Sequence, residues 1–400
     1  MEQIFHWMAA QLDLSFLYRR YVHLYVNGVR RDQGSAVYSD TQEPGSDYLK
    51  QWYPADKNGD LYKIELWWQS YVFPLTTGVV YVNPTLTLQL RSGALDIPRY
   101  RWNWLKRSVQ AGLASDYTSI SNLLMTLTNA NAPSYLTNVQ SQVDVEQWMR
   151  VVALRRIACE WDGYGAGNLH NAYAFKPATN RWRLHATDVD TAFVVSGVSP
   201  NKPMTTGWSI EPKIADMINT PAFRRDFYRA VQDAVNGPMR PATHLPSLTA
   251  NYAALTDNGI APSNSFLIVT NNMVGTNTVF YSNYFTPASW LSNRWNSLTN
   301  ELAKVTQTFA ITNHAGANYA VTNATNITLS GKAPMEVVYI RVNGAATNAN
   351  VTWTSVTNWS LGVTLAFPPS TNTTTVQGYD RLNQLLATNL YQKSITITNK

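Results

Sequence analysis

The chain has 400 residues, of which 45% are hydrophobic, so it is long enough for two domains with packed cores. Only 14% of the residues are charged, and the formal net charge of +6 comes from basic residues that are spread along the chain. This distribution argues against a nucleic-acid groove, which needs clustered basic residues, and the 14 Trp and 22 Tyr residues argue against disorder.

The N-terminal part of the chain is predicted to contain one helix and a β-hairpin. Residues 1–18 carry apolar side chains near helical spacing, and because the chain opens directly into this pattern we expect an N-terminal part to be missing. Residues 21–26 alternate and are rich in β-branched and aromatic residues, which predicts a strand. Asn27-Gly28 then indicates a hairpin, with a return strand at 34–38 and a loop at 39–47.

The middle of the chain is predicted to be largely helical. Residues 98–159 show helical patterns that are interrupted near 129–133, and the clearest helix spans 143–159 with Asp144 as its N-terminal cap. A glycine-rich loop follows at 163–167. The elements expected after this loop are strands at 172–175 and 182–186 and helices at 210–218, 221–235 and 289–304.

From about Thr306 the composition changes to short alternating runs rich in Thr and Asn. Asn, Gly and Pro turns separate these runs at intervals of about ten residues, which is the pattern of a β-sandwich. The predicted strands are residues 319–321, 327–329, 337–342, 351–354, 359–365, 373–377 and 394–398. We therefore expect an α+β body followed by a single all-β module, which limited proteolysis should release as a fragment of roughly 85–95 residues.

The cellular compartment is predicted from what the chain lacks and from its polar composition. Cys159 is the only cysteine, so an internal disulfide is ruled out, and its apolar surroundings indicate a small core residue. A secreted protein without disulfides is more typical of bacteria. The sequence has no signal peptide and no apolar run near the roughly 18 residues of a membrane span. The neutral polar residues suit a surface outside the cell, so we expect an extracellular or cell-envelope protein.

Acidic and amide residues recur in a fixed order in the window WDGYGAGNLHNAYAFKPATNRWRLHATDVDTAF, residues 161–193. Asp162 follows the clearest helix, and Asn171 lies beyond the glycine-rich loop. Asp188 and Asp190 close the second strand. Phosphoryl transfer needs a carboxylate to orient or deprotonate the nucleophile, and it needs oxygen ligands to hold magnesium against the phosphates. A carboxylate, an amide and a metal-binding carboxylate in this order are typical of kinase-like active sites.

The same window resembles the pattern of the spore-coat CotH kinase family, in WD-x-Y-G-x-G-N, N-x-Y-A-F-K-P, R-W-x-L and D-V-D-x-A-F. YVHLYVNGV, VYSDTQEPGSDYLKQWYP and GDLYKIE look like the strand, hairpin and exit loop of that family. EPKIADMINTPAFRRDFYRAV looks like its C-terminal helices, and WLSNRWNSLTNEL, with Arg294, looks like its closing helix. The resemblance covers residues 1–305.

The resemblance implies an atypical protein-kinase-like body, mostly the C-lobe, at residues 1–305. A linker at 306–317 and a sandwich similar to bacterial Ig-like domains at 318–400 would follow. It also implies roles for the acidic and amide residues of the window. Asp162 would be the catalytic Asp, and Asn171 and Asp188 would bind ATP through Mg²⁺ or Mn²⁺, with Asp190 as a further metal ligand. The implied reaction transfers phosphate from ATP to Ser or Thr of a coat or surface protein.

The chain departs from the family at two points. Thr187 stands where the family often has an aromatic residue before the metal-binding Asp, which alters packing more than chemistry. The family's site also uses an N-terminal sheet and a strand Lys ahead of the first helix, and Lys63 follows that region instead. The cation that pairs the phosphates is thus expected to be absent, so this chain should transfer little phosphate.

Simpler interpretations of each feature stay open. Asp188 and Asp190 could form a solvated turn, Asp162 could cap the loop after it, and His170 has no second His or Cys at zinc-ligand spacing. The Trp residues fit core packing as well as they fit sugar stacking. A non-catalytic surface protein, for adhesion, structure or glycan binding, is therefore the alternative to an enzyme.

Overall fold

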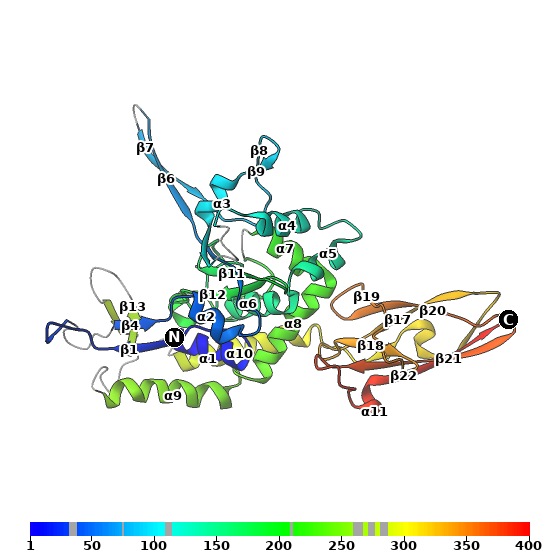
Figure 1. The fold of residues 1–400 in the computed structure, drawn as a ribbon. Coiled ribbons are helices and arrows are strands. Elements are labelled where there is room, and N and C mark those ends of the chain that lie inside the picture. The colour runs from blue at the N-terminus through cyan, green and yellow to red at the C-terminus, as the bar shows by residue number, and fades with distance from the viewer. Residues whose placement is uncertain are drawn as a thin grey trace. The chain divides into compact units, whose positions relative to one another are not determined.

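The computed structural model describes residues 1–31, 38–73, 76–108, 114–208, 211–258, 267–270, 277–280 and 287–400 (Figure 1), without the side chains of residues 67–82, 195, 256, 267–270 and 277–280. The chain divides into two compact units. The first unit comprises Met1–Ile218 and Asp233–Thr299. The second comprises Asn219–Gln232 and Asn300–Lys400. Helices and sheets mix in the first unit and sheets dominate the second, so the fold class is α+β, as predicted.

The first unit holds most of the helices. They are α1 (Glu2–Gln11), α2 (Ser46–Trp52), α3 (Ile97–Asn103), α4 (Thr118–Leu127), α5 (Tyr135–Gln142), α6 (Val145–Ile157), α7 (Pro212–Asn219), α9 (Pro241–Asp257) and α10 (Pro287–Ala303). Helix α8 (Pro221–Asn236) contributes its first twelve residues to the second unit. Helix α6 is buried on nearly every side, and the Asp144 carboxylate caps it by accepting from the Gln147 amide at 3.3 Å, as predicted.

A four-stranded antiparallel sheet crosses the first unit in the order β10 (Trp104–Ser108), β5 (Gly59–Ile64), β11 (Ala172–Pro177), β12 (Arg183–Ala186). Residues of β11 are buried almost without interruption, as expected for a central strand covered on both faces. Helix α6 packs against β12, where the Trp148 indole donates to the Trp182 carbonyl at 3.1 Å. The predicted strands at 172–175 and 182–186 are confirmed as β11 and β12.

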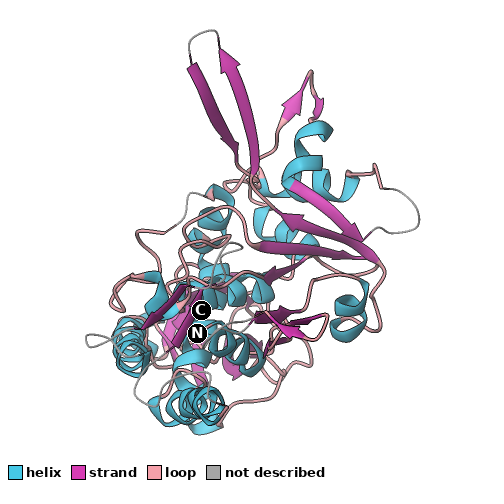
Figure 2. Cartoon of the chain, turned by 90° about the vertical axis from the view of Figure 1, so that its left-hand side faces the viewer, coloured by secondary structure: helices cyan, strands magenta, loops and turns pink. Residues whose placement is uncertain are grey.

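Separate two-stranded pairs surround this sheet (Figure 2). They are β1 (Arg19–Val22) with β4 (Tyr38–Thr41), β2 (Tyr25–Val26) with β3 (Val29–Arg30), β6 (Trp67–Phe73) with β7 (Thr76–Val82), β8 (Leu90–Arg91) with β9 (Ala94–Leu95), and β13 (Leu267–Thr270) with β14 (Asn277–Phe280). Asn27 and Gly28 both have left-handed φ values, 52° and 76°, which a tight hairpin turn requires. The predicted hairpin at this dipeptide is confirmed by the pairing of Val26 with Val29.

Five local predictions were wrong. The first helix ends at Gln11, because Asp13 takes a left-handed φ of 54°. The strand predicted at 21–26 is divided between β1 and β2, which have different partners. The return strand of the hairpin is β3, which begins directly after the Asn27-Gly28 turn, and residues 34–37 of the strand predicted at 34–38 lie outside the described residues. The loop predicted at 39–47 begins inside strand β4. Residues 104–108 form a strand instead of a helix, because pairing with β5 overrides the local pattern.

The second unit is a β-sandwich. One sheet has the order β15 (Ala310–Ile311), β17 (Asn326–Lys332), β20 (Asn358–Thr364), β19 (Thr352–Trp353), and the other has β16 (Tyr319–Val321), β22 (Gln392–Asn399), β21 (Ser370–Tyr379), β18 (Tyr339–Val342). Leu329 and Trp359 from the first sheet share a buried core with Ile340 and Ile397 from the second. Each of the seven predicted strands overlaps one of these strands, and β15 was not predicted.

A buried arginine of α8 completes the second unit. The Arg225 guanidinium donates to the carbonyls of Ala333 at 3.1 Å, Val356 at 2.7 Å and Val337 at 2.6 Å, and to that of Pro334. It also lies over the Trp353 ring, 3.9 Å from the centroid. The α8 segment is therefore part of the sandwich unit, although about seventy residues of sequence separate it from the strands.

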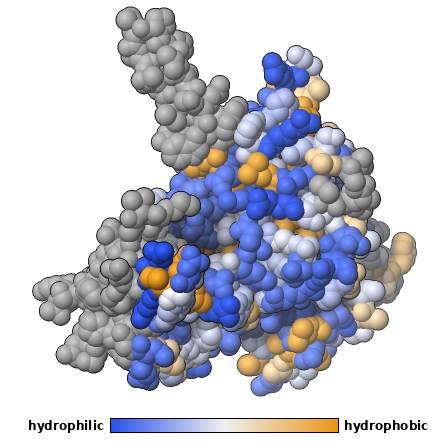
Figure 3. Space-filling model, turned by 60° about the vertical axis from the view of Figure 1, so that its left-hand side comes forward, coloured by the Kyte–Doolittle hydropathy of each residue, from blue (hydrophilic) through white to orange (hydrophobic). Residues whose placement is uncertain are grey.

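The surface is mostly polar on the face drawn in Figure 3, where hydrophobic residues are scattered among hydrophilic ones. None of the helices in the described parts of the chain combines the length and apolar character that a membrane crossing requires. Cys159 is buried, as expected for a small core residue.

Candidate active site

One end of the β11–β12 hairpin gathers the predicted site residues. Asn171 immediately precedes β11 and Thr187 immediately follows β12, and the Thr187 amide donates to the Asn171 carbonyl at 3.2 Å. The two strands are antiparallel, with Ala172 opposite Ala186, so the start of one and the end of the other lie at the same edge. Asp188 is consequently next to the residue that pairs with Asn171.

Asp162 reaches the same edge from the loop after α6. The Asn171 side-chain Nδ2 donates to the Asp162 carbonyl at 2.8 Å and to its Oδ2 at 3.3 Å. Asn171 and Asp188 both take left-handed φ values, 60° and 48°, which Asn and Asp tolerate better than other non-glycine residues. Because the Asn171 Nδ2 donates to Asp162, the Oδ1 of the same side-chain amide points away from Asp162.

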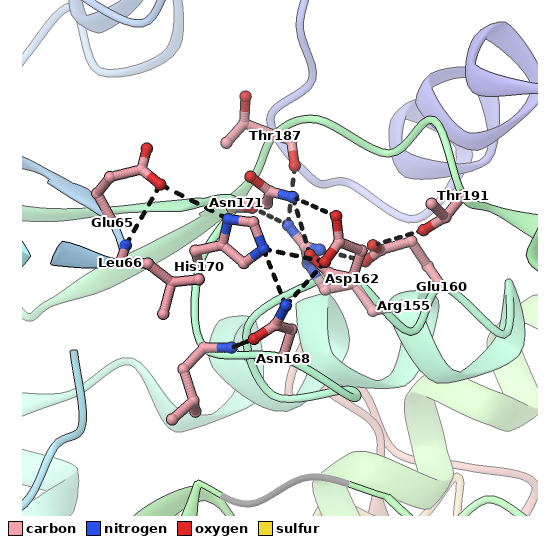
Figure 4. Close-up of polar contacts among 11 residues, drawn as sticks. Glu65, Leu66, Arg155, Glu160, Asp162, Asn168, His170, Asn171, Thr187 and Thr191 are labelled. Atoms are coloured by element: carbon pink, nitrogen blue, oxygen red, sulfur yellow. Dashed lines mark hydrogen bonds and ion pairs between the residues drawn. The ribbon is translucent and has the colours of Figure 1, made fainter. Parts of the chain in front are cut away.

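Arg155 of α6 ties these segments together (Figure 4). Its fully buried guanidinium forms an ion pair with Glu160 and donates to the carbonyls of Asn171 and, at 3.1 Å, Thr187. A Cβ at Gly163 would overlap both the Arg155 guanidinium and the Glu160 carboxylate, so only glycine fits there. One side chain thus fixes the loop before Asp162 and the backbone on both sides of the hairpin edge.

His170 holds the Asp162 carboxylate from the opposite direction (Figure 4). Its Nε2 lies 2.9 Å from Asp162 Oδ1, and its Nδ1 lies 3.6 Å from Glu65 Oε1. Burial lowers the pKa of His170, but its hydrogen bonds to the two carboxylates outweigh burial and raise the pKa to about 9. Lys63, 2.9 Å from Glu65, extends the charged chain. His170 is therefore a charged partner of Asp162 at neutral pH.

The carboxylates at this edge differ in electrostatic environment. Burial raises the pKa of Asp162, but hydrogen bonds from His170 and Asn168 outweigh it, so the net shift is downward and Asp162 is ionised at neutral pH. Burial, followed by the charges of Asp188 and Asp162, raises the pKa of Asp190. Asp188 and Asp162 thus each lie near enough to repel Asp190, which favours binding of a cation.

The donor set fits a magnesium-type cation. Among the residues that the structure describes, no group of three or more His, Cys, Asp or Glu side chains is arranged to hold a metal ion. Magnesium at nucleotide sites, however, takes one or two carboxylates and completes its shell with water and phosphate oxygens. Asp188, which is exposed, and Asn171 Oδ1 are oxygen donors of this kind at one sheet edge. Their binding roles, and that of Asp190, stay predictions.

Sequence patterns identified some of these residues and missed others. The structure brings Asp162 into direct contact with Asn171, and no hydrogen bond links Asn171 to Asp188 among the described side chains. Arg155 and Glu65 were missed, since a charged residue in a helix or strand is ordinarily interpreted as solvent-facing. The one available signal was Gly163 after a buried helix, because a glycine in a loop can mark close approach by another group.

A comparison with known families agrees with this geometry. The family described as CotH kinase protein matches residues 5–262. None of the curated proteins compared with the chain matches it. The matched residues include the whole hairpin edge, helix α6 and the Glu65 strand end. Because the match covers more than half of the chain and every residue of the candidate site, the chain belongs to the CotH kinase family and is a kinase-like protein.

Proposed function

We propose that this protein transfers the γ-phosphoryl group of ATP, bound with Mg²⁺ or Mn²⁺, to Ser or Thr of a coat or surface protein in the cell envelope or outside the cell. The observation that carries the proposal is the contact of Asp162 with Asn171 at the edge where Asp188 follows β12. A carboxylate beside an amide and a second carboxylate is the donor set that phosphoryl transfer needs.

Each of the three residues has a distinct task under this proposal. Asp162 Oδ1 has two partners, His170 and Asn168, whereas among the described residues Oδ2 accepts only the 3.3 Å bond from Asn171, so Oδ2 is the oxygen that accepts a hydrogen bond from the substrate hydroxyl and then its proton. The lowered pKa of Asp162 suits orientation of the hydroxyl more than strong base catalysis. Asn171 Oδ1 and Asp188 would hold the metal ion, which when bound neutralises charge on the phosphates.

The test uses the full chain with radiolabelled ATP and extracted coat or surface proteins. Magnesium-dependent transfer is expected at a low rate, because the sequence predicts that the phosphate-pairing cation is absent, and Asp162→Asn and Asp188→Asn should each reduce that rate by at least about 100-fold. Asp56→Asn is the matched control, because Asp56 binds the backbone of residues 178 and 179, remote in sequence from the hairpin edge. If the chain neither binds ATP nor transfers phosphate with either metal, the proposal is wrong and the non-catalytic surface protein takes its place.

We also propose the domain division 1–305, 306–317 and 318–400, with the last part similar to bacterial Ig-like domains. The sandwich architecture of the second unit supports the last part, whereas Phe309 and strand β15, within the proposed linker, also belong to the sandwich. The α8 residues that belong to the same unit argue that the strands do not fold fully without them. Limited proteolysis followed by mass spectrometry tests this division, and a first cut far from 306–317 would contradict it.

A further inference from the structure

An arm of the first unit carries exposed apolar side chains at its tip. Strands β1 and β4 form the stem of this arm, which extends away from helices α1 and α2 in Figure 1, and the β2–β3 hairpin with its flanks, residues 24–31, forms the tip. Leu24, Tyr25, Val26 and Val29 are each between 41% and 59% exposed. Isolated apolar residues are ordinary on a protein surface, but a contiguous group of them is typical of an interaction site.

The apolar side chains point to both sides of the hairpin. In an antiparallel pair, residues that lie opposite each other share a face, and successive residues of a strand alternate between faces. Tyr25 pairs with Arg30, and Val26 pairs with Val29. Tyr25 therefore lies on one face of the tip and the two valines lie on the other.

The tip is also basic. Arg30 and Arg31 are both exposed, and residues 24–31 include no Asp or Glu. The Arg30 Nη2 donates to His23 Nδ1 at 2.8 Å, which holds this guanidinium at the tip. Lower in the arm, Arg20 has Asp40 as its counter-ion at 2.8 Å. The tip thus adds two positive charges and no negative charge of its own.

These features fit an anionic lipid surface better than a folded protein. A stable protein interface buries roughly 800 Å² on each partner, and a flat partner covers only one face of a hairpin. The boundary of a bilayer surrounds an inserted tip, so it can bury apolar side chains on both faces, and it accommodates Tyr at the level of the headgroups. Arginines near an anionic bilayer bind lipid phosphates, and each strengthens attachment by about fivefold.

We propose that the β2–β3 tip docks this protein on a membrane that contains anionic phospholipids. The side chains of Leu24, Tyr25, Val26 and Val29 enter the headgroup boundary, and Arg30 and Arg31 bind lipid phosphates. Docking of this kind is peripheral and reversible, because only a few apolar side chains leave water. It does not depend on the proposed transfer of phosphate, and either can fail without the other.

The experiment measures cosedimentation of the full chain with vesicles of phosphatidylcholine, alone or mixed equally with phosphatidylglycerol. The wild type should bind the mixed vesicles at least about tenfold more tightly than the neutral ones. Val29→Asp should weaken binding to the mixed vesicles at least about tenfold, because a carboxylate at the tip opposes both insertion and the surface charge. Leu90→Asp is the matched control and should bind as the wild type does, since Leu90 is also 56% exposed but lies in the β8–β9 hairpin.

The electrostatic part has its own variant. Replacing both tip arginines, by Arg30→Gln with Arg31→Gln, should weaken binding to the mixed vesicles by about 10- to 30-fold. A wild type that does not bind the mixed vesicles would overturn the inference, as would wild-type binding by Val29→Asp or by the double arginine variant.

A second measurement locates the contact. Cys159 is the only cysteine and is buried, so Val26→Cys provides one accessible thiol for an environment-sensitive fluorophore. Its emission should shift to the blue when the mixed vesicles are added, and a label at Leu90→Cys should not respond. If instead the chain dimerises and Val29→Asp abolishes the dimer, the tip is an interface between two copies and the inference is overturned.

Discussion

Each of the two units buries an arginine that donates to backbone carbonyls, but the carbonyls belong to segments of different kinds. In the first unit Arg155 binds the carbonyls of Asn171 and Thr187 and has Glu160 as its counter-ion. In the second unit Arg225 binds four carbonyls, in the turns around residues 333–337 and 356, and lies over the Trp353 ring. The first arginine organises residues with candidate chemistry, whereas the second closes a hydrophobic core.

The surrounding polar networks differ in the same way. Around Arg155 the hydrogen bonds link charged groups that titrate, including Asp162, His170 and Glu65. On the β21–β22 face of the sandwich they link neutral hydroxyls, such as Thr375 with Ser394 at 2.8 Å. Stability and ligand binding should therefore respond strongly to charge and pH in the first unit and weakly in the second.

Removing Arg155 is expected to have the largest effect. Arg155→Met leaves Glu160 buried without its counter-ion and removes a donor from the carbonyls of Asn171 and Thr187, so the free energy of unfolding should fall by roughly 3–5 kcal/mol. Urea unfolding measures this, with Arg101→Met, at an exposed position of α3, as the control. Binding of the metal–nucleotide complex should fall as well. If Arg155→Met is as stable as the wild type, Arg155 does not organise the candidate site and the contrast between the two arginines fails.

Removing Arg225 should destabilise without affecting the site. Arg225→Met removes the donor of four carbonyls, of which, among the described residues, only that of Pro334 keeps a second one, from the Val337 amide, so the change should cost about 2–4 kcal/mol in the same unfolding experiment. Arg240→Met, at an exposed position, is the control. At a temperature where the variant is folded, nucleotide binding should equal that of the wild type. A loss of binding as large as that of Arg155→Met would show that the two arginines do not differ in role.

The pH dependence of stability should separate the two units further. The folded-state pKa of His170 is raised to about 9 from an ordinary 6.5, so its stabilising contribution is complete below pH 6.5 and is lost as the pH rises through 9. We expect a contribution of about 2 kcal/mol, measured as the difference in unfolding free energy between wild type and His170→Gln at pH 6 and pH 10. A difference that does not change between these two pH values would contradict the ion-pair assignment of His170.

The smallest effect is expected on the exposed sandwich face. Thr375→Val removes a hydroxyl pair that water can replace, so the free energy of unfolding should change by less than about 0.5 kcal/mol at any pH from 5 to 9. Thr374→Val, one residue away, is the comparison variant at a buried position, since Thr374 is only 2% exposed. A pH-dependent loss in Thr375→Val would remove the distinction between charged and neutral networks.

The sequence alone determined the parts of this protein that are encoded locally. Strand β16 has the predicted bounds, Tyr319–Val321, because alternation and turn residues specify a strand within a few positions. The order of Asp162, Asn171 and Asp188 could be recognised because a loop and one hairpin connect them, and a hairpin returns the chain to the same edge.

Only the tertiary structure decided which distant residues serve that edge. Strand β10 is extended because it pairs with β5, about forty residues away in the sequence. Arg155 reaches the hairpin edge from the interior of helix α6. An arginine in a sequence carries no mark of burial, because its cost is offset by carbonyls and carboxylates that only folding brings to it.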